Sequence, residues 1–488
     1  GSSEFTAENI GRKAGLYVTG QNAQLIAQAK KDISLQASEL NSQGSVSVQA
    51  GRDLNLSTVN VSRKDLSSAG DDDYVMHASS KDVGTQIQAK HDIQLKSGGA
   101  TSIQAGVINS KEGNVVIDAT KGLSVTEGRE TSAHALSTHE QRSNAVSSSR
   151  KDNLLEEREN LAVASVISGK QIVLNSGQDI TIQGSNVVSD DLTQIQAKEN
   201  ISITAAENQY AKVSESTVKK SGFTGSLSDG VASVGYGKTN IKQDNKSQST
   251  SLTQSVVGSV NGNTNIIAGQ DLNAVASIIE AGKDINLMGK NVHLDAADIK
   301  QDTQSKFESK SSGVSIGFTY SGEAAAAASA KKSQDNNDFS DSAVGKIMSS
   351  AETVRKATMA ATTPVVFQAH KQKTTKTKDT SSTQSVGTEV KAGGNLNIIA
   401  TEGDIRSQGA KISAEGDGLL HAKNNVDLLA TQNTESQTAD SKRKGFSIDN
   451  RDHVAPLGVY NDKEKANGGF VQSVGTELSV GGKTTIKA

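Results

Sequence analysis

The sequence predicts an all-β fold: a right-handed parallel β-helix, or β-solenoid, with extruded hairpin or loop excursions and one short amphipathic helix. Two observations support this prediction. A short phrase recurs at the spacing of one solenoid coil, and the apolar residues are mostly small. Of 488 residues, 34% are apolar but only 3% are aromatic, and Trp and Cys are absent. A conventional globular core needs large side chains, so this composition favours a narrow, repetitive core.

The recurring phrase reads small–Gly–x–Asp/Asn–apolar–x–apolar. Gly takes positive φ cheaply and Asp or Asn can hydrogen-bond its own backbone two residues on, so the phrase predicts a corner that enters a strand. Ile33 and Leu54 occupy the same place in two copies, 21 residues apart, which suits one three-sided coil. Antiparallel β-sandwich domains are the alternative, but hairpin-turn signals and large core residues are lacking. The nine copies begin at Ala29, Ala50, Ala89, Ser176, Ala197, Ala268, Ala281, Ala392 and Ala422.

The coil phrases fall into blocks separated by polar excursions rich in Ser, Thr and Lys. Residues 1–5 read as a vector scar, so we expect the chain to be an excised fragment. Related restart phrases begin at Lys81, Ser385 and Ser473, which indicates a larger unit of about 90 to 130 residues above the coil. Coils are expected at 6–57, 81–126, 161–205, 256–299, 386–430 and 473–488, and excursions at 58–80, 127–160, 206–255, 300–385 and 431–472.

Three excursions contain a phrase centred on Gly-Phe or a variant of it, and the aromatic residues gather there. Apolar and polar residues alternate around these phrases, which predicts amphipathic strands outside the solenoid ladder. Such a strand either folds back along the solenoid flank and buries its apolar side there, or inserts into an outer membrane, for which roughly 9–11 alternating residues suffice. The candidate membrane- or partner-contacting residues are Phe223, Tyr236, Val314, Ile316, Phe318, Tyr320 and Phe446.

The longest excursion also carries a helical signal. Apolar residues at helical spacing predict an amphipathic helix over 341–361, ended near Pro364, and residues 146–161 are a weaker helix candidate. A basic segment follows the first helix, with lysines at 371, 373, 376 and 378. This segment could favour an anionic surface or form a solvated loop.

No arrangement of residues in the sequence points to catalysis, a cofactor or a metal. His134 and His139 lie in a polar excursion without an HExxH pattern, and Asp71, Asp72 and Asp73 lack the context of a calcium loop. The net charge of −3 and the few aromatic residues give no support for a nucleic-acid groove. We therefore expect no enzyme activity, no cofactor, no nucleic acid and no small-molecule substrate.

Taken together, the AGxDLxL, SVGTE and GFT or GFS phrases resemble the second class of haemagglutinin repeats in two-partner-secreted exoproteins of the filamentous-haemagglutinin type, especially those of contact-dependent growth inhibition. The resemblance implies export by an outer-membrane transporter of the two-partner type, with transient passage through the periplasm. It also implies a place on the bacterial cell surface, contact with a target cell's outer membrane or a surface component, and inward passage of a C-terminal toxin. A passive adhesin stalk, or a haemagglutinin surface that binds host or other cells, is the alternative.

Overall fold

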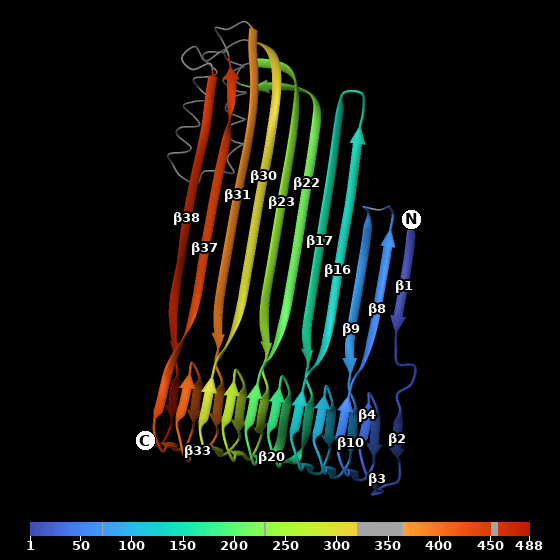
Figure 1. Ribbon diagram of the computed structural model, residues 1–488, viewed down its shortest axis with the longest axis vertical. Coiled ribbons are helices and arrows are strands. Elements are labelled where there is room, and N and C mark those ends of the chain that lie inside the picture. Colours follow the sequence, from blue (N-terminus) through green and yellow to red (C-terminus); the bar gives the residue numbers. More distant parts are fainter. Residues whose placement is uncertain (71, 229–230, 320–364, 450–456) are drawn as a thin grey trace.

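The computed structural model describes residues 1–70, 72–228, 231–319, 365–449 and 457–488, and every helix or strand in these ranges is a β-strand. Short strands stack into a solenoid, and long strands that pair with one another project from one side of it (Figure 1). The predicted β-solenoid is therefore confirmed. The helix predicted at 341–361 lies outside the described residues.

Each coil of the solenoid has three strand positions, and the strands β18 (Val166–Ser176) and β20 (Asn186–Ala197) each span the first two. The first position otherwise holds β2 (Gly15–Val18), β5 (Glu39–Ser42), β10 (Gln86–Ala89), β13 (Val107–Ser110), β24 (Val256–Ser259), β27 (Ile278–Ala281), β32 (Glu389–Ala392), β35 (Lys411–Ala414) and β39 (Glu477–Val480). The second holds β3 (Leu25–Ala29), β6 (Val46–Ala50), β11 (Ile93–Ser97), β14 (Val115–Ala119), β25 (Asn263–Ala268), β28 (Ile285–Gly289), β33 (Leu396–Ala400), β36 (Gly418–Ala422) and β40 (Thr484–Lys487).

The third position holds β4 (Ile33–Gln36), β7 (Leu54–Ser57), β12 (Thr101–Gln104), β15 (Leu123–Thr126), β19 (Ile180–Gln183), β21 (Ile201–Thr204), β26 (Leu272–Val275), β29 (Val292–Asp295), β34 (Ile405–Gln408) and the start of β37 (Val426–Asp449). Strands at equal positions pair in parallel, so equivalent residues stack coil on coil. One such column runs through Ile33, Leu54, Thr101, Leu123, Ile180, Ile201, Leu272, Val292, Ile405 and Val426. Stacked small apolar residues fill the core without aromatic rings.

The Asp or Asn of the corner phrase does not act as expected. Its side chain accepts a hydrogen bond from the next coil rather than from its own backbone: the N–H of Asp53 donates to Asp32 at 3.0 Å, and the N–H of Asn200 to Asp179 at 2.9 Å. A second ladder of this kind runs along the corner before the second strand, where the N–H of Asn395 donates to Asp284 at 2.7 Å. The phrase therefore stabilises the stacking of coils as well as the turn.

At the third corner, tight turns and long hairpins alternate from coil to coil. The tight turns hold one residue at positive φ, as at Ala37 (44°), Ala105 (46°) and Ala276 (47°). In the intervening coils the chain leaves the solenoid here and returns through a pair of long strands. The long strands are β1 (Ser2–Glu8), β8 (Val59–Ser68), β9 (Tyr74–Val83), β16 (Gly128–Ser143), β17 (Ser147–Val163), β22 (Ala206–Ser228), β23 (Val231–Thr253), β30 (Ala297–Thr319), β31 (Val365–Val386), β37 and β38 (Leu457–Gly475).

The long strands pair antiparallel with one another, in chain order from β1 to β38. Hairpins folded back along the solenoid flank were one expectation; they instead stand away from the coils as one sheet (Figure 1). The helix expected at 146–161 is wrong, because this segment is β17, paired on one side with β16 and on the other with β22. Backbone pairing on both edges overrides a local helical tendency.

The spacing of the hairpins follows from strand geometry. Adjacent coils and adjacent strands are both separated by about 4.8 Å, so a hairpin of two strands fills the width of two coils. One hairpin in every second coil therefore tiles the sheet without gaps or overlap.

A column of buried hydroxyl groups occupies the position before several of the first-position strands. Thr85, Ser165, Ser255 and Thr388 follow hairpins there, and Ser185 follows a tight turn; all five are fully buried. The Ser255 hydroxyl donates to the carbonyl of Thr204 at 2.7 Å and accepts from the N–H of Ser185 at 3.2 Å. These hydroxyls satisfy backbone groups that the corner would otherwise leave buried and unpaired. The Thr of the restart phrases occupies this column.

Candidate functional site

Most of the predicted contact residues share one face of the long-strand sheet, near the ends farthest from the coils. Phe223 of β22 lies opposite Tyr236 of β23, and Tyr236 lies opposite Val314 of β30. The rings of Phe223 and Tyr236 meet edge to face, with their centroids 5.6 Å apart. Residues directly opposite on neighbouring strands point to the same side of a sheet. The alternation in three separate strands therefore builds a single apolar surface.

This surface continues into residues that the sequence analysis did not single out. The row extends from Val314 through Ala369 of β31 and Ile448 of β37 to Leu457 of β38. Two residues farther out on the same face, Val234, Ile316 and Phe367 form a second row. Exposed fractions are 63% for Phe223, 65% for Val234, 55% for Val314 and Ile316, and 57% for Leu457. We call Phe223, Val234, Tyr236, Val314, Ile316, Phe367, Ile448 and Leu457 the apolar tip.

Two of the predicted residues, Phe318 and Tyr320, are described only in part or not at all. Phe318 belongs to β30, where its backbone pairs with Ala232 and Val365, and Tyr320 lies outside the described residues. Phe446 lies on the tip face but nearer the coils, opposite Lys371 and Val459.

The opposite face of the tip carries glycine where the first face carries large apolar residues. Gly222, Gly237 and Gly313 are directly opposite one another on β22, β23 and β30. Gly235 lies in the next position on that face, and a Cβ there would come within 2.4 Å of the Val314 carbonyl oxygen. One face of the tip is therefore apolar, whereas the opposite face carries glycine.

Below the apolar tip, on the same face, lies a band of basic side chains. Lys310, Lys373 and Lys444 are directly opposite one another on β30, β31 and β37, and Arg150 and Lys219 are opposite one another on β17 and β22. The band lines a groove of about 850 Å³. Among the described residues that line the groove none is acidic, and the basic ones are Arg150, Lys219, Lys220, Lys238, Lys310, Lys371, Lys373 and Lys444. Lys220 directly follows Lys219 in β22 and therefore belongs to the opposite face, so we call the other seven residues the basic band.

Two carboxylates at the border of the groove neutralise part of the basic band. Glu308 contacts the ammonium groups of Lys310 at 2.7 Å and Lys373 at 3.6 Å, and Lys310 is the main reason that the pKa of Glu308 is lowered. Asp152 lies 2.9 Å from Arg150, whose hydrogen bond is the first cause of the lowered pKa of Asp152. The remaining lysines of the band have no ion pair within the part of the chain that the structure describes.

The basic segment at 371–378 is a strand, so the expectation of a solvated loop is wrong. Lys371 and Lys373 alternate onto the groove face, whereas Lys376 faces the other side, where burial lowers its pKa. The sequence did carry a signal for the band. Basic residues precede the Gly-Phe phrases in KKSGF and KRKGF, but only the register of the sheet shows that they adjoin.

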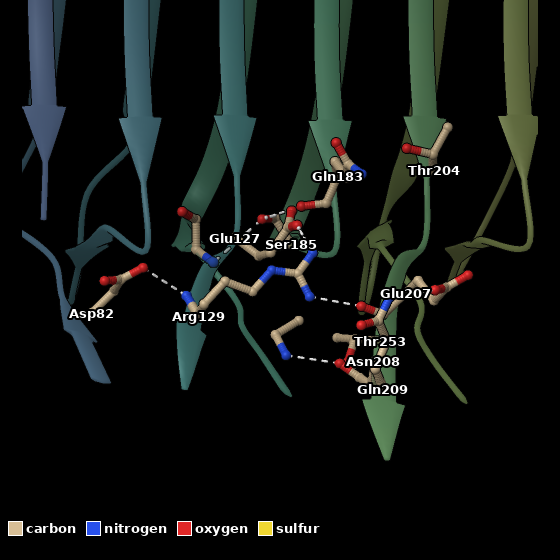
Figure 2. Close-up of polar contacts among 12 residues, drawn as sticks. Asp82, Glu127, Arg129, Gln183, Ser185, Thr204, Glu207, Asn208, Gln209 and Thr253 are labelled. Carbon is tan, nitrogen blue, oxygen red and sulfur yellow. Dashed lines mark hydrogen bonds and ion pairs between the residues drawn. The ribbon is translucent and has the colours of Figure 1, made fainter. Parts of the chain in front are cut away.

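At the other end of the hairpins, a charged cluster secures the junction with the coils. The Arg129 guanidinium donates to the Glu127 carboxylate at 2.7 Å and to the Glu207 carbonyl of the next hairpin at 2.6 Å (Figure 2). The Glu127 side chain is only 8% exposed. Asp82 of β9 accepts the backbone N–H of Arg129 at 2.8 Å (Figure 2). Arg129 therefore connects three successive hairpins at their base.

Similar hydrogen bonds to side-chain acceptors join other neighbouring hairpins at their base. Asn208 of β22 accepts the N–H of Ala162 at 2.7 Å, and Asn433 of β37 accepts the N–H of Ser385 at 2.8 Å. Each acceptor sits where backbone pairing between two hairpins ends. These contacts fix the hairpins to one another close to the coils.

The histidines do not form a metal site in the described part of the chain. His77 and His134 stack across β9 and β16 with centroids 4.4 Å apart, and His139 hydrogen-bonds to Asp152. In the described ranges, no three His, Cys, Asp or Glu side chains converge as metal ligands. No described helix is long and apolar enough to cross a membrane.

Comparison with known proteins gives a consistent result. A family model described as Hemagglutinin repeat matches residues 144–250, 234–358 and 369–488. A tRNA nuclease CdiA of Escherichia coli strain STEC_O31 is 26% identical over 91% of this chain and 14% of its own length. A Toxin CdiA of Yersinia pestis is 29% identical over 63% of this chain and 10% of its own, and a Deoxyribonuclease CdiA of Yersinia pseudotuberculosis YPIII is 29% identical over 60% and 29%. The chain thus spans less than a third of each relative, and no solved structure matches it.

Proposed function

The chain belongs to the hemagglutinin repeat family, and from this premise we propose that it is the structural and delivery module of a secreted bacterial surface exoprotein in contact-dependent growth inhibition. The family resemblance carried by the coil, restart and Gly-Phe phrases is confirmed. In the proposed role, the module engages the target cell's outer membrane and supports the passage of a C-terminal toxin. Export through a two-partner transporter, by way of the periplasm to the cell surface, belongs to the same proposal.

The observation that carries this proposal is the apolar tip. Soluble proteins rarely leave a contiguous row of apolar side chains in water, and such a patch usually marks a surface that meets a partner or a membrane. Val234, Val314 and Ile316 are each more than half exposed at the ends of strands that the coils hold in place. A passive stalk would need the ladder of coils but not this surface.

The proposal can be tested with outer-membrane vesicles and protease. The chain is mixed with vesicles from a Gram-negative bacterium and digested, and the protected peptides are identified by mass spectrometry. We expect vesicles to protect peptides from the ends of β22, β23 and β30, and to leave the cleavage of the coils unchanged.

Matched variants make the test specific. Val234→Asp and Val314→Asp each place a charge on the apolar tip and should abolish the protection. Val260→Asp is the control, because Val260 is 61% exposed at a corner of the solenoid, far from the tip in the fold. If no tip peptide is protected, or if the Val260 variant loses protection equally, membrane engagement by the tip is wrong and the stalk or adhesin role gains support.

A further inference from the structure

We propose that the basic band is a binding site for the phosphate groups of anionic lipids, positioned to hold headgroups while the apolar tip enters the acyl region. This inference rests on the proposed function and names the lipid chemistry that the surface selects. It draws on the register of six strands, which places the charges and the apolar residues on one face.

The first argument is the direct juxtaposition of like charges. Lys310, Lys373 and Lys444 occupy adjacent positions across three neighbouring strands. Like charges directly opposite each other destabilise a sheet, so this arrangement calls for an anion between them. Glu308 supplies one carboxylate to the first two, and Lys444 has no ion pair among the described residues. A phosphate carries several acceptor oxygens and can be shared by such a row of lysines.

The second argument is the distance between the basic band and the apolar residues. Lys444 and Phe446 are two residues apart on β37, and Lys238 and Tyr236 two apart on β23, all on the groove face. Two residues along a strand span about 6.6 Å. Amphipathic elements at a bilayer surface bury their apolar side by about 5–10 Å, with basic groups at the headgroups, so the spacing matches an interface.

The third argument separates a lipid surface from a nucleic acid, which also offers phosphates. A nucleic-acid groove combines lysines with aromatic side chains on which bases stack. Here Tyr236 and Phe446 border the lysines, but the surface beyond them is aliphatic, with Val234, Val314 and Ile316 exposed at the tip. Exposed aliphatic side chains gain free energy in the acyl region but offer bases no stacking surface.

The test is flotation of the whole chain with vesicles of two compositions: phosphatidylcholine alone, and phosphatidylcholine mixed with phosphatidylglycerol. We expect binding to be stronger to the anionic vesicles and to weaken as salt is added. Replacing Lys238, Lys371 and Lys444 together by Gln should reduce binding to anionic vesicles by roughly 10- to 100-fold. Binding to neutral vesicles should remain at its original, weaker level.

The matched control removes the same charge elsewhere, as Lys111→Gln, Lys198→Gln and Lys283→Gln, three exposed lysines at coil corners. This variant should bind as the unchanged chain does. The long-strand sheet should stay folded in both triple variants, which hydrogen exchange of β23 and β31 verifies. Loss of binding in the control variant would overturn the assignment to the basic band.

Other outcomes separate this inference from the proposed function. Equal binding to both vesicles that still requires Val314 would keep membrane engagement and overturn the headgroup site. Failure to bind either vesicle would overturn both. Lysine-dependent binding to single-stranded DNA, with none to anionic vesicles, would replace the lipid by a nucleic acid.

Discussion

Lys310 of β30 and Lys373 of β31 lie directly opposite one another and share the carboxylate of Glu308. The two ammonium groups would repel each other without it. Because Glu308 is itself on β30, two positions nearer the coils, this carboxylate stabilises the pairing of the two strands immediately below the apolar tip.

Replacing Glu308 by Gln should loosen the β30–β31 pair in a pH-dependent manner. Lys310 and Lys373 lower the pKa of Glu308 below its ordinary value of 4.5, so the stabilisation is fully present above that value and is lost as the pH falls through the lowered pKa. We expect the variant to lose about 0.5–1 kcal/mol at neutral pH and to match the unchanged chain in strong acid. Proteolysis of the β30–β31 pair in urea, repeated across pH, measures the difference.

Glu140→Gln is the matched control for that experiment. Glu140 is exposed on β16 and has no ion pair within the described ranges. Its variant should show no pH-dependent change. An equal effect of the two substitutions would mean that Glu308 acts only through net charge.

Removing Arg129 should weaken the base of three hairpins. Arg129→Met leaves the Glu127 carboxylate, 8% exposed, without its cation, and we expect a loss of about 2 kcal/mol in the local unfolding free energy of β16. Hydrogen exchange of β16 and β22 measures it. Adding Glu127→Gln should restore part of the loss, since a neutral amide is less costly to bury. If the double variant is no more stable than Arg129→Met, the burial of Glu127 is not the cause.

Arg158→Met is the control for this prediction. Arg158 is 71% exposed and lies 3.7 Å from Glu156. Such surface pairs contribute little, so the change should stay within about 0.5 kcal/mol.

The hydroxyl column should contribute measurably to coil stacking. The Thr388 hydroxyl lies 2.8 Å from the Asp295 carbonyl and 3.1 Å from the Ala274 carbonyl, and the Ser277 N–H reaches it at 3.4 Å. Thr388→Val keeps the shape but removes these contacts, so we expect a loss of about 1–2 kcal/mol in thermal unfolding. Thr388→Ser keeps the hydroxyl and should lose less. If Ser is as damaging as Val, packing of the methyl group decides stability at this corner.

The solenoid could be predicted from the sequence because its signal is local and repeated. Each copy of the corner phrase contains the turn residue and the first two core residues of a strand, so Ile33 and Leu54 indicate stacking without any knowledge of the rest. The role of Asp32 was only partly predicted, since its acceptor function toward Asp53 needs the next coil in place.

The sheet of long strands could not be predicted in the same way. Its strands are rich in Ser, Thr and Lys on both faces over most of their length, so β17 even carries a helical pattern around Leu154. The long strands form one sheet because tight turns and hairpins alternate along the coils. This alternation cannot be recognised from the sequence of any single strand. The alternation of apolar and polar residues predicted the strands that carry Phe223, Tyr236 and Val314. The joining of Lys219, Lys310 and Lys444 into one band depends on cross-strand register. The contact role of the tip residues stays a prediction.

Deleting a single coil should disrupt the sheet of long strands and leave the solenoid folded. Removing residues 256–277 joins Ser255 to Ile278 at equivalent corner positions, so the parallel ladder can continue. The hairpins β22–β23 and β30–β31 then leave from adjacent coils, about 4.8 Å apart, although each needs about 9.6 Å. We expect fast hydrogen exchange in β23 and β30, while the coil strands on either side stay protected.

Removing a whole two-coil unit should leave the sheet intact. Deletion of residues 85–164 takes out two coils and the β16–β17 hairpin together, and brings Ser165 to the corner position of Thr85. β9 can then pair with β22 at the original spacing, so both the coils and the long strands should remain protected. If the single-coil deletion also leaves β23 and β30 protected, the two-coil spacing does not determine the sheet, and the long strands must assemble independently of the ladder.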